Sequence, residues 1–485
     1  MVARKRGRGG WAAPLGLFGS FGYEFAGLAL ATGALHFHLV AGDRAGVGPL
    51  NGVAVHLAGH GERHGVASDL AIGNRRIALS AGDRAGELFA VSFQSEDLFA
   101  GFPIAAGHLR GPLTGHIGGD ERSRQERKRY EELFDHVAKT THTGLMFRAA
   151  EYKGQRAIAV APCVPVSPAA GEVQIQVSHC GICGTDLHLF HGNMDPRVSL
   201  PQVIGHESSG TIVALGEGVT DWAVGDRVTV RPLAPCGDCP TCRRGHSHVC
   251  PNLQFIGIDA PGAMQGLWTI PAHTLHRLPD ALSLLDAALV EPIAVACHDV
   301  RMGRVTAGEF AVVIGGGPIG ALVALVARHH GARVVVTEIN PFRVKLLREM
   351  GLEVLDPRTT DVPAFVQAET ATDGADVVFE VSGSAPGAEL MTKLGRVRAR
   401  IVVVAVFPKP VPVDLHKMFW KEQEMIGTRV YEPQDFDEAI ALLAAGEVPF
   451  RSLITGVYPL DEVQKGLLEM EQGANVMKIL VDCAS

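Results

Sequence analysis

The stretch FAVVIGGGPIGALVALVARHHGARVVVTEIN, residues 310–340, constrains the fold of this chain more than any other part of it. An apolar run typical of a buried parallel strand leads through G-x-G-x-x-G into a helical pattern and a second strand at 334–336. Glycines at this spacing permit a tight turn, let a pyrophosphate approach the backbone and let the helix pack closely, while the helix amino end favours phosphate charge. The pattern predicts a doubly wound α/β domain that binds a dinucleotide. The predicted contact residues are Gly315, Gly317, Pro318, Ile319 and Gly320.

The choice of dinucleotide is predicted from the residues that follow the second strand. Glu338, eighteen residues after Gly320, can accept hydrogen bonds from the adenosine ribose hydroxyls and would repel a 2'-phosphate. Arg343, close by, can stack on adenine or tolerate a phosphate. The acid favours NAD as the cofactor, with NADP as the alternative.

A second feature is the stretch PCGDCPTCRRGHSHVC at 235–250, which has the spacing C-x2-C-x2-C-x7-C. Four thiolates this close can complete the tetrahedral coordination of one zinc ion, and such a closed site has no position for a substrate. We therefore predict a structural zinc site. Free thiols in a loop are one alternative, and a nucleic-acid-binding zinc ribbon is another. The predicted ligands are Cys236, Cys239, Cys242 and Cys250.

Charge and cysteine usage restrict the partners and the compartment. The formal net charge is -8, and a nucleic acid gains nothing from a surface of that sign, so we expect a small-molecule substrate. The nine cysteines are an odd number with tight local clustering. This usage is typical of reduced thiols that bind metal in the cytoplasm rather than of a secreted disulfide framework.

Three further stretches supply a second, more widely spaced set of metal-binding side chains. They are HCGICGTDLHLFHG at 179–192, VIGHESSGTIVALGEGV at 203–219 and LVEPIAVACH at 289–298. A mixture of cysteine, histidine and carboxylate ligands with one position left open is what a catalytic zinc needs. The candidate residues are Cys180, Cys183, Thr185, Asp186, His188, His206, Glu207 and Glu291.

These motifs, in this order, resemble the zinc-dependent alcohol dehydrogenase family of the medium-chain dehydrogenase/reductase superfamily. The resemblance covers about residues 146–485 and includes GICGTD and the four-cysteine lobe. It implies a GroES-like, mostly β catalytic domain at 146–295, a Rossmann domain at 296–436, and a return to the catalytic domain at 437–485. Strand patterns at 376–383 and 400–407 extend the Rossmann sheet. The signature residues are Gly205, His206, Glu207, Gly210, Gly216 and Val219.

The resemblance also implies roles for the candidate residues. Cys183, His206 and Glu207 would bind the catalytic zinc, with Cys180 as a neighbour. Glu291, in a Glu-Pro pair, resembles the sorbitol, butanediol and threonine dehydrogenase branch, and binds zinc directly or through water. Thr185 would accept the hydroxyl proton of the substrate, and His188 or the cofactor ribose would pass it toward solvent.

The expected function is hydride transfer between a secondary alcohol or polyol and NAD, assisted by one catalytic and one structural zinc ion. The resemblance further implies a homo-oligomer, a tetramer or a dimer. The alternative is a zinc-stabilised NAD-binding protein without dehydrogenase activity. Metal content distinguishes the two, because the enzyme should hold two zinc ions per chain and the binding protein one.

Residues 1–145 differ from the rest: they hold 25 of the 57 glycines, and neither a helical nor a strand period persists. We expect an atypical extension and not a packed domain. It is either a disordered native segment or upstream DNA translated through a misplaced start codon, with Met146 as the natural start. A signal or membrane helix is less favoured, because the uncharged run 25–42 only reaches the lower length limit for a span. The intact mass of the protein from its own organism decides between these origins.

Overall fold

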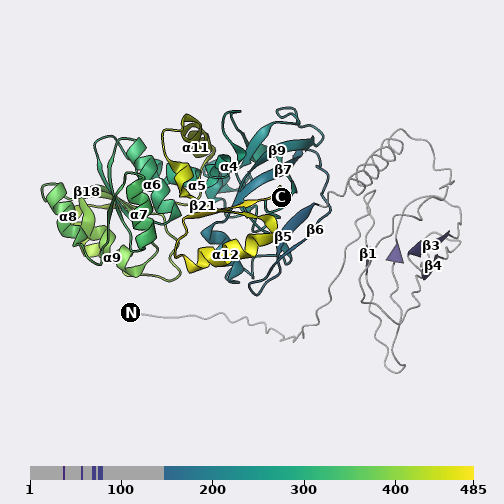
Figure 1. The fold of residues 1–485 in the computed structure, drawn as a ribbon, viewed down its shortest axis with the longest axis horizontal. Coiled ribbons are helices and arrows are strands. Elements are labelled where there is room, and N and C mark those ends of the chain that lie inside the picture. The colour runs from purple at the N-terminus through teal and green to yellow at the C-terminus, as the bar shows by residue number, and fades with distance from the viewer. Residues whose placement is uncertain (1–36, 39–55, 58–67, 73–74, 80–146, 485) are drawn as a thin grey trace, which may run out of the picture. The chain divides into compact units, whose positions relative to one another are not determined.

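The computed structural model describes residues 147–484 and, before them, only four short strands (Figure 1). The chain divides into two compact units, Met1–Asp120 and Glu121–Ser485. In the first unit, β1 pairs with β2 and β3 pairs with β4, both antiparallel. The expectations for 1–145 otherwise concern residues outside the described ones. The bounds are β1 Phe37–His38, β2 His56–Leu57, β3 Ser68–Ile72 and β4 Arg75–Leu79.

A mostly β domain in the second unit is built on a seven-stranded sheet of order β14-β10-β9-β7-β22-β21, with β13 on β7. Val173, Ile175 and Val177 alternate along β7 and are buried in its core. Strand β22, near the end of the chain, pairs antiparallel with β7, so that Leu480 lies opposite Gly181. The bounds are β7 Glu172–Gly181, β9 Glu207–Leu215, β10 Arg227–Val230, β13 Leu267–Pro271, β14 Leu275–Arg277, β21 Ile454–Pro459 and β22 Lys478–Asp482.

Smaller elements complete this domain. Strands β6, β5 and β8 form a three-stranded sheet, and β11 pairs with β12 beside the four-cysteine lobe. The strands are β5 Arg148–Tyr152, β6 Ile158–Pro162, β8 Gln202–Val203, β11 Leu233–Ala234 and β12 Gln254–Phe255. The helices are α2 Gly184–Phe190, α3 Pro240–Arg243, α4 Leu284–Ala287 and α12 Val463–Gln472, with 3-10 turns at Ser247–Val249, Ala272–Thr274, Phe450–Leu453 and Leu460–Glu462.

The second domain is a parallel sheet of order β17-β16-β15-β18-β19-β20. Helices surround this sheet in the green part of Figure 1. The doubly wound α/β domain predicted from the glycine motif is confirmed. The strands are β15 Phe310–Ile314, β16 Arg333–Thr337, β17 Glu353–Leu355, β18 Ala375–Glu380, β19 Gly395–Val403 and β20 Glu424–Gly427. The helices are α6 Pro318–His329, α7 Pro341–Glu349, α8 Val362–Glu369, α9 Ala385–Leu394 and α10 Leu415–Lys421.

Two helices join the domains. Helix α5, Val290–Met302, packs against α6 of the parallel sheet and against α11, Pro433–Ala445. His298 and Arg301 of α5 bind Asp435 of α11 at 2.9 and 2.7 Å. In the part of the chain that the structure describes, no helix is both long enough and apolar enough to cross a membrane.

Candidate active site and zinc sites

Three of the predicted ligands meet where β7 and β9 lie side by side. Cys183 is the N-cap of α2, while Glu207 begins β9 and His206 directly precedes it. One ligand atom from each lies within 4.8 Å of the others. Gly205 has φ +96°, and a Cβ there would come within 2.7 Å of Cys180 Sγ, so only glycine turns the chain into this position.

A buried carboxylate supports two of these residues from behind. Asp186 accepts the backbone N–H of Cys183 at 2.8 Å through Oδ2, and its Oδ1 lies 3.6 Å from His206 Nδ1. Asp186 Oδ1 and His206 Nδ1 are both buried, and neither has a hydrogen-bond partner among the described residues. A carboxylate that faces one ring nitrogen orients the other toward a metal. Sulfur, imidazole and carboxylate therefore fit a zinc ion with an open position.

A lysine that sequence analysis missed completes the charge balance. The ammonium group of Lys478 on β22 forms an ion pair with Glu207 Oε2 and donates to the Ile182 carbonyl at 3.0 Å. Both charged side chains are buried, and a buried ion pair needs such additional hydrogen bonds. A Cβ on Gly181 would lie 2.0 Å from Glu207 Oε2, so glycine makes room for the pair. The only sequence signal was a lone lysine beginning a buried strand.

Glu291 lies near this site but outside the group of three. It is buried near the start of α5 and accepts the Tyr431 hydroxyl at 2.7 Å. Burial raises the pKa of the Glu291 carboxyl to about 7, a direction that a nearby divalent cation would oppose. Tyr431 was also missed, because nothing in its local sequence marks it as a partner.

The remaining residues of the predicted catalytic set lie along α2 and β7. Thr185 is half-buried, and His188, one helical turn later, is exposed with Nδ1 3.5 Å from Asn193 Nδ2. Cys180 is fully buried on β7 behind Gly205. Its position is that of a packing neighbour and not of a member of the three-residue group.

The four lobe cysteines converge as their spacing predicts. All four sulfurs lie within 4.8 Å of one another, with Cys250 Sγ 3.5 Å from Cys236 Sγ and 3.8 Å from Cys239 Sγ. A zinc tetrahedron with bonds of about 2.3 Å has edges of about 3.8 Å, which matches these separations. The backbone amide of Cys242 lowers the pKa of the Cys239 thiol to about 6, which favours the thiolate that a metal binds.

A third group, His298, Glu432 and Asp435, was not predicted from the sequence. Its carboxylates already have a cationic partner. Arg301 donates to Asp435 at 2.7 Å and to Glu432 at 2.5 Å. The group is therefore an ion-pair network that joins α5 to α11.

The dinucleotide loop has the geometry that each glycine predicts. Gly315 has φ +102° and lies against Ser382, where a Cβ would be 3.0 Å from the backbone. A Cβ on Gly320 would lie 1.9 Å from the Gly315 carbonyl oxygen, so glycine lets α6 pack on the turn. Gly317 is the N-cap of α6, where a Cβ would lie 3.6 Å from Arg343 Nη1, and Pro318 and half-buried Ile319 begin the helix.

Glu338 directly follows β16, the strand that comes after α6. Its carboxylate accepts backbone N–H groups from Gly316 at 2.9 Å and from Ile339 and Asn340 at 2.7 Å each. These bonds fix the acid beside the glycine turn. Arg343, on α7, donates through Nε to the Val476 carbonyl at 3.4 Å.

Comparison with known proteins agrees with this fold. Family models match for an alcohol dehydrogenase GroES-like domain at 169–280 and a zinc-binding dehydrogenase at 318–445. A 2-dehydro-3-deoxy-L-galactonate 5-dehydrogenase from Pseudoalteromonas atlantica is 50% identical, over 69% of this chain and 98% of that protein. A sorbitol dehydrogenase from Halalkalibacterium halodurans is 33% identical, over 65% and 92%. The crystal structure of 2R,3R-butanediol dehydrogenase from Bacillus subtilis has a TM-score of 0.65 and 30% identity, over 69% and 99%.

The chain belongs to the zinc-dependent alcohol dehydrogenase family of the medium-chain dehydrogenase/reductase superfamily. It is an oxidoreductase, and the predicted pairing of a GroES-like with a Rossmann domain is confirmed. The resemblance to the sorbitol, butanediol and threonine dehydrogenase branch is confirmed as well. These relatives are all dehydrogenases, so they favour the enzyme over a binding protein without activity.

Proposed function

We propose that the enzyme oxidises a secondary hydroxyl group of a sugar acid or a related polyol to a ketone, with NAD as the acceptor. The observation that carries the proposal is the convergence of Cys183, His206 and Glu207, whose ligand atoms lie within 4.8 Å. The relative that is 50% identical over nearly its whole length is named as acting on a sugar acid, which supports that substrate class.

The chain would prepare the reaction by binding and by charge. Bound zinc would draw electron density from the substrate oxygen, and bound NAD would accept the hydride. Cys183, His206 and Glu207 would hold the metal, with Asp186 fixing the histidine ring. Lys478 offsets the charge of Glu207 and so limits the negative charge of the three-residue group.

A proton leaves the substrate hydroxyl as the hydride leaves its carbon. We assign its acceptance to the Thr185 hydroxyl, which is half-buried beside Cys183. Either His188, exposed three residues later on α2, or a cofactor ribose hydroxyl would then pass the proton to solvent. General acid–base transfer of this kind contributes about 10² to 10⁴ in rate.

A substrate screen tests the proposal. The zinc-loaded enzyme is given NAD with 2-dehydro-3-deoxy-L-galactonate, L-galactonate, sorbitol, 2,3-butanediol or L-threonine, and NADH is followed by absorbance. We expect kcat/KM for one of the sugar acids to exceed that for the other classes by about 10-fold or more, since a site that hydrogen-bonds extra hydroxyls discriminates against compounds lacking them. Faster turnover of butanediol or threonine would contradict the proposed substrate class.

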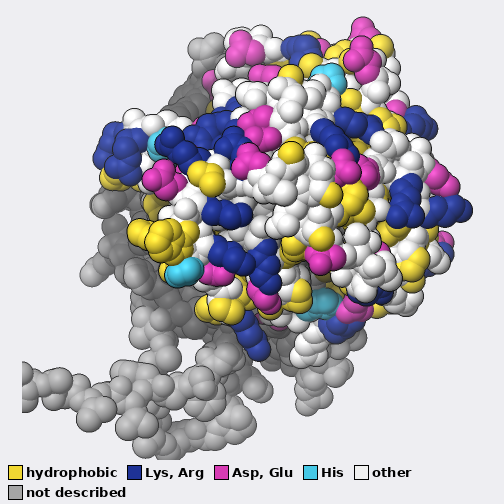
Figure 2. Space-filling view, turned by 90° about the vertical axis from the view of Figure 1, so that its left-hand side faces the viewer, with side chains coloured by type: hydrophobic (Ala, Val, Ile, Leu, Met, Phe, Trp, Pro, Cys, Tyr) yellow, Lys and Arg dark blue, Asp and Glu magenta, His cyan; other side chains and the backbone are white. Residues whose placement is uncertain are grey.

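We also propose that two or more copies of the chain associate through α10 and β20. Leu415, Phe419 and Trp420 on α10 have exposures of 69%, 75% and 69%, and β20 is an edge strand of the described sheet. Exposed apolar groups beside an unpaired strand edge favour pairing with a second copy. Figure 2, which faces the α/β end of the molecule, shows hydrophobic side chains gathered near its left edge among charged ones.

Sedimentation equilibrium measures this association. The wild-type protein should have a mass of two or four chains, and Phe419→Glu/Trp420→Glu should shift it toward a single chain, because the charges oppose burial of the face. Val457→Glu, which adds a charge at another exposed apolar position, is the control. A monomeric wild type, or an unchanged mass in the double variant, would overturn the proposal.

A cytoplasmic location is proposed from the cysteines. All nine lie within the described residues and all are free thiols. The lobe needs reduced sulfur to bind zinc, and a reducing compartment maintains that state.

A further inference from the structure

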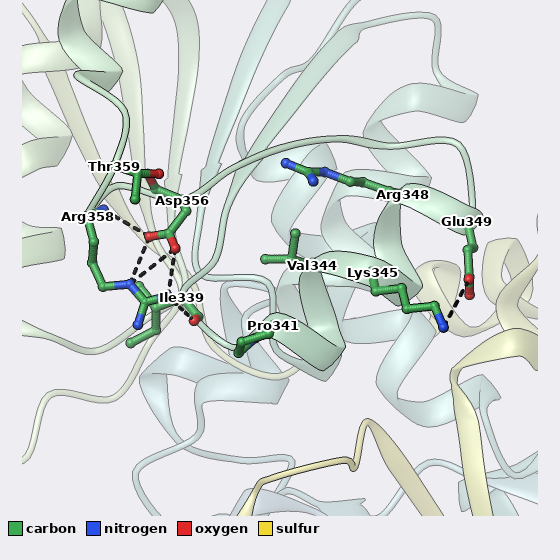
Figure 3. A pocket seen from close by; sticks show the side chains of 9 residues that line it. All are labelled: Ile339, Pro341, Val344, Lys345, Arg348, Glu349, Asp356, Arg358 and Thr359. Atoms are coloured by element: carbon green, nitrogen blue, oxygen red, sulfur yellow. Dashed lines mark hydrogen bonds and ion pairs between the residues drawn. The ribbon is translucent and has the colours of Figure 1, made fainter.

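A cavity of about 680 Å³ opens beside the end of the dinucleotide-binding strand β16. It lies between α7 and the loop that follows β17 (Figure 3). Its apolar wall includes Ile339, the residue directly after Glu338. Charged side chains also line it: Lys345, Arg348, Glu349, Asp356 and Arg358.

Asp356 and Arg358 form the pair nearest to Ile339. The carboxylate accepts Arg358 Nε at 2.9 Å through Oδ1 and Arg358 Nη2 at 2.6 Å through Oδ2. The same Nη2 donates to the Ile339 carbonyl at 2.7 Å. Figure 3 shows the guanidinium turned toward this carboxylate. Arg358 is thus bound to Ile339, the residue that follows Glu338, the acid predicted to bind the adenosine ribose.

An arginine at this place has a specific chemical meaning. In dinucleotide-binding sheets the acid after the second strand binds the ribose 2'-hydroxyl, whereas a nearby arginine accommodates a 2'-phosphate. Guanidinium binds phosphate in the same forked manner as it binds carboxylate. Here the donors Nε and Nη2 of Arg358 are already hydrogen-bonded to the Asp356 carboxylate.

We propose that Asp356 is a specificity-determining residue that keeps Arg358 from binding the 2'-phosphate of NADP. The proposal rests on the proposed NAD-linked function and extends it to a second acid. Glu338 favours the hydroxyl, and Asp356 neutralises the guanidinium that is bound to the carbonyl of the next residue, Ile339. Arg343, a second arginine near this turn, donates instead to the Val476 carbonyl at 3.4 Å, and its Nη1 lies 3.6 Å from the position that a Cβ on Gly317 would take. The other pocket cations do not replace Arg358, because Arg348 donates to the Val354 carbonyl at 2.7 Å and Lys345 lies 3.8 Å from Glu349.

The test measures nucleotide binding without turnover. Asp356→Asn keeps the shape of the side chain and removes its charge, so Arg358 is released. Titration of the zinc-loaded protein with NADPH and NADH, followed by nucleotide fluorescence, gives both dissociation constants. We expect the Kd of NADPH to fall by about 10-fold or more, and the Kd of NADH to change by less than about 3-fold.

Two variants serve as controls. Glu349→Gln removes one negative charge from the same cavity but beside Lys345, and should leave the Kd of NADPH unchanged. In the double variant Asp356→Asn/Arg358→Gln, the Kd of NADPH should return to about the wild-type value. An unchanged NADPH affinity in folded Asp356→Asn, an equal gain in Glu349→Gln, or equal wild-type affinity for both nucleotides would overturn the proposal. Failure of the substrate screen alone would instead count against the proposed reaction, since these titrations need no substrate.

Discussion

Cys183→Ser should lose the catalytic-site zinc and lower kcat/KM by about 10³-fold or more, while the protein stays folded. A hydroxyl replaces the one thiolate of the three-residue group, and neutral oxygen is a poor zinc ligand. The fold should persist because Asp186 bonds the backbone N–H of residue 183, which serine retains. Elemental analysis should find one zinc per chain instead of two, with an unchanged melting curve.

Cys180→Ala is the matched control for this substitution. Cys180 lies three positions earlier and is fully buried behind Gly205, outside the ligand group. The variant should keep two zinc ions and most of its activity, with a modest loss of stability from the small cavity. Near-normal turnover by Cys183→Ser would refute the assignment of Cys183, and zinc loss in Cys180→Ala would point to the neighbour instead.

Cys239→Ser should lower the thermal stability of the protein. Cys239 contacts Cys250 and caps α3, so its loss opens a tetrahedral site that holds the lobe together. Structural zinc contributes folding energy directly, and we expect the melting temperature to fall by about 5 °C or more, with one zinc lost per chain.

The control for the lobe variant is Cys163→Ser, a half-buried cysteine that belongs to neither group of sulfur ligands. It should keep both zinc ions and the wild-type melting temperature within about 2 °C. Should Cys239→Ser melt like the wild type while binding two zinc ions, the lobe would not be a structural metal site.

The two groups of candidate metal ligands could be predicted from the sequence because their residues lie in short, recognisable motifs. The lobe cysteines lie within the short segment 236–250, and Cys183 and His206 belong to signatures whose spacing is local. Lys478 could not be found in this way. Its contact with Ile182 spans 296 positions and depends on β22 pairing with β7.

Strand boundaries, too, could be predicted where a local pattern marks them and not where they depend on distant contacts. The strand expected at 334–336 is β16, Arg333–Thr337, because a continuous valine run marks it. The strand expected at 400–407 instead begins at Gly395. Its first half carries Arg396 and Arg398, whose charged side chains hide the pattern, and Arg396 is held by Asp376 at 2.6 Å on the neighbouring strand. Cross-strand ion pairs of this kind are invisible to a local hydrophobic period.

The position of Lys478 has a consequence for biosynthesis. The ribosome makes the three candidate ligands first, then the α/β domain, and only afterwards the strand that brings the ammonium group to Glu207. Until that strand docks, the buried carboxylate lacks its counter-ion. The charge of Glu207 is therefore balanced only when the last strand of the described chain has joined the sheet beside β7.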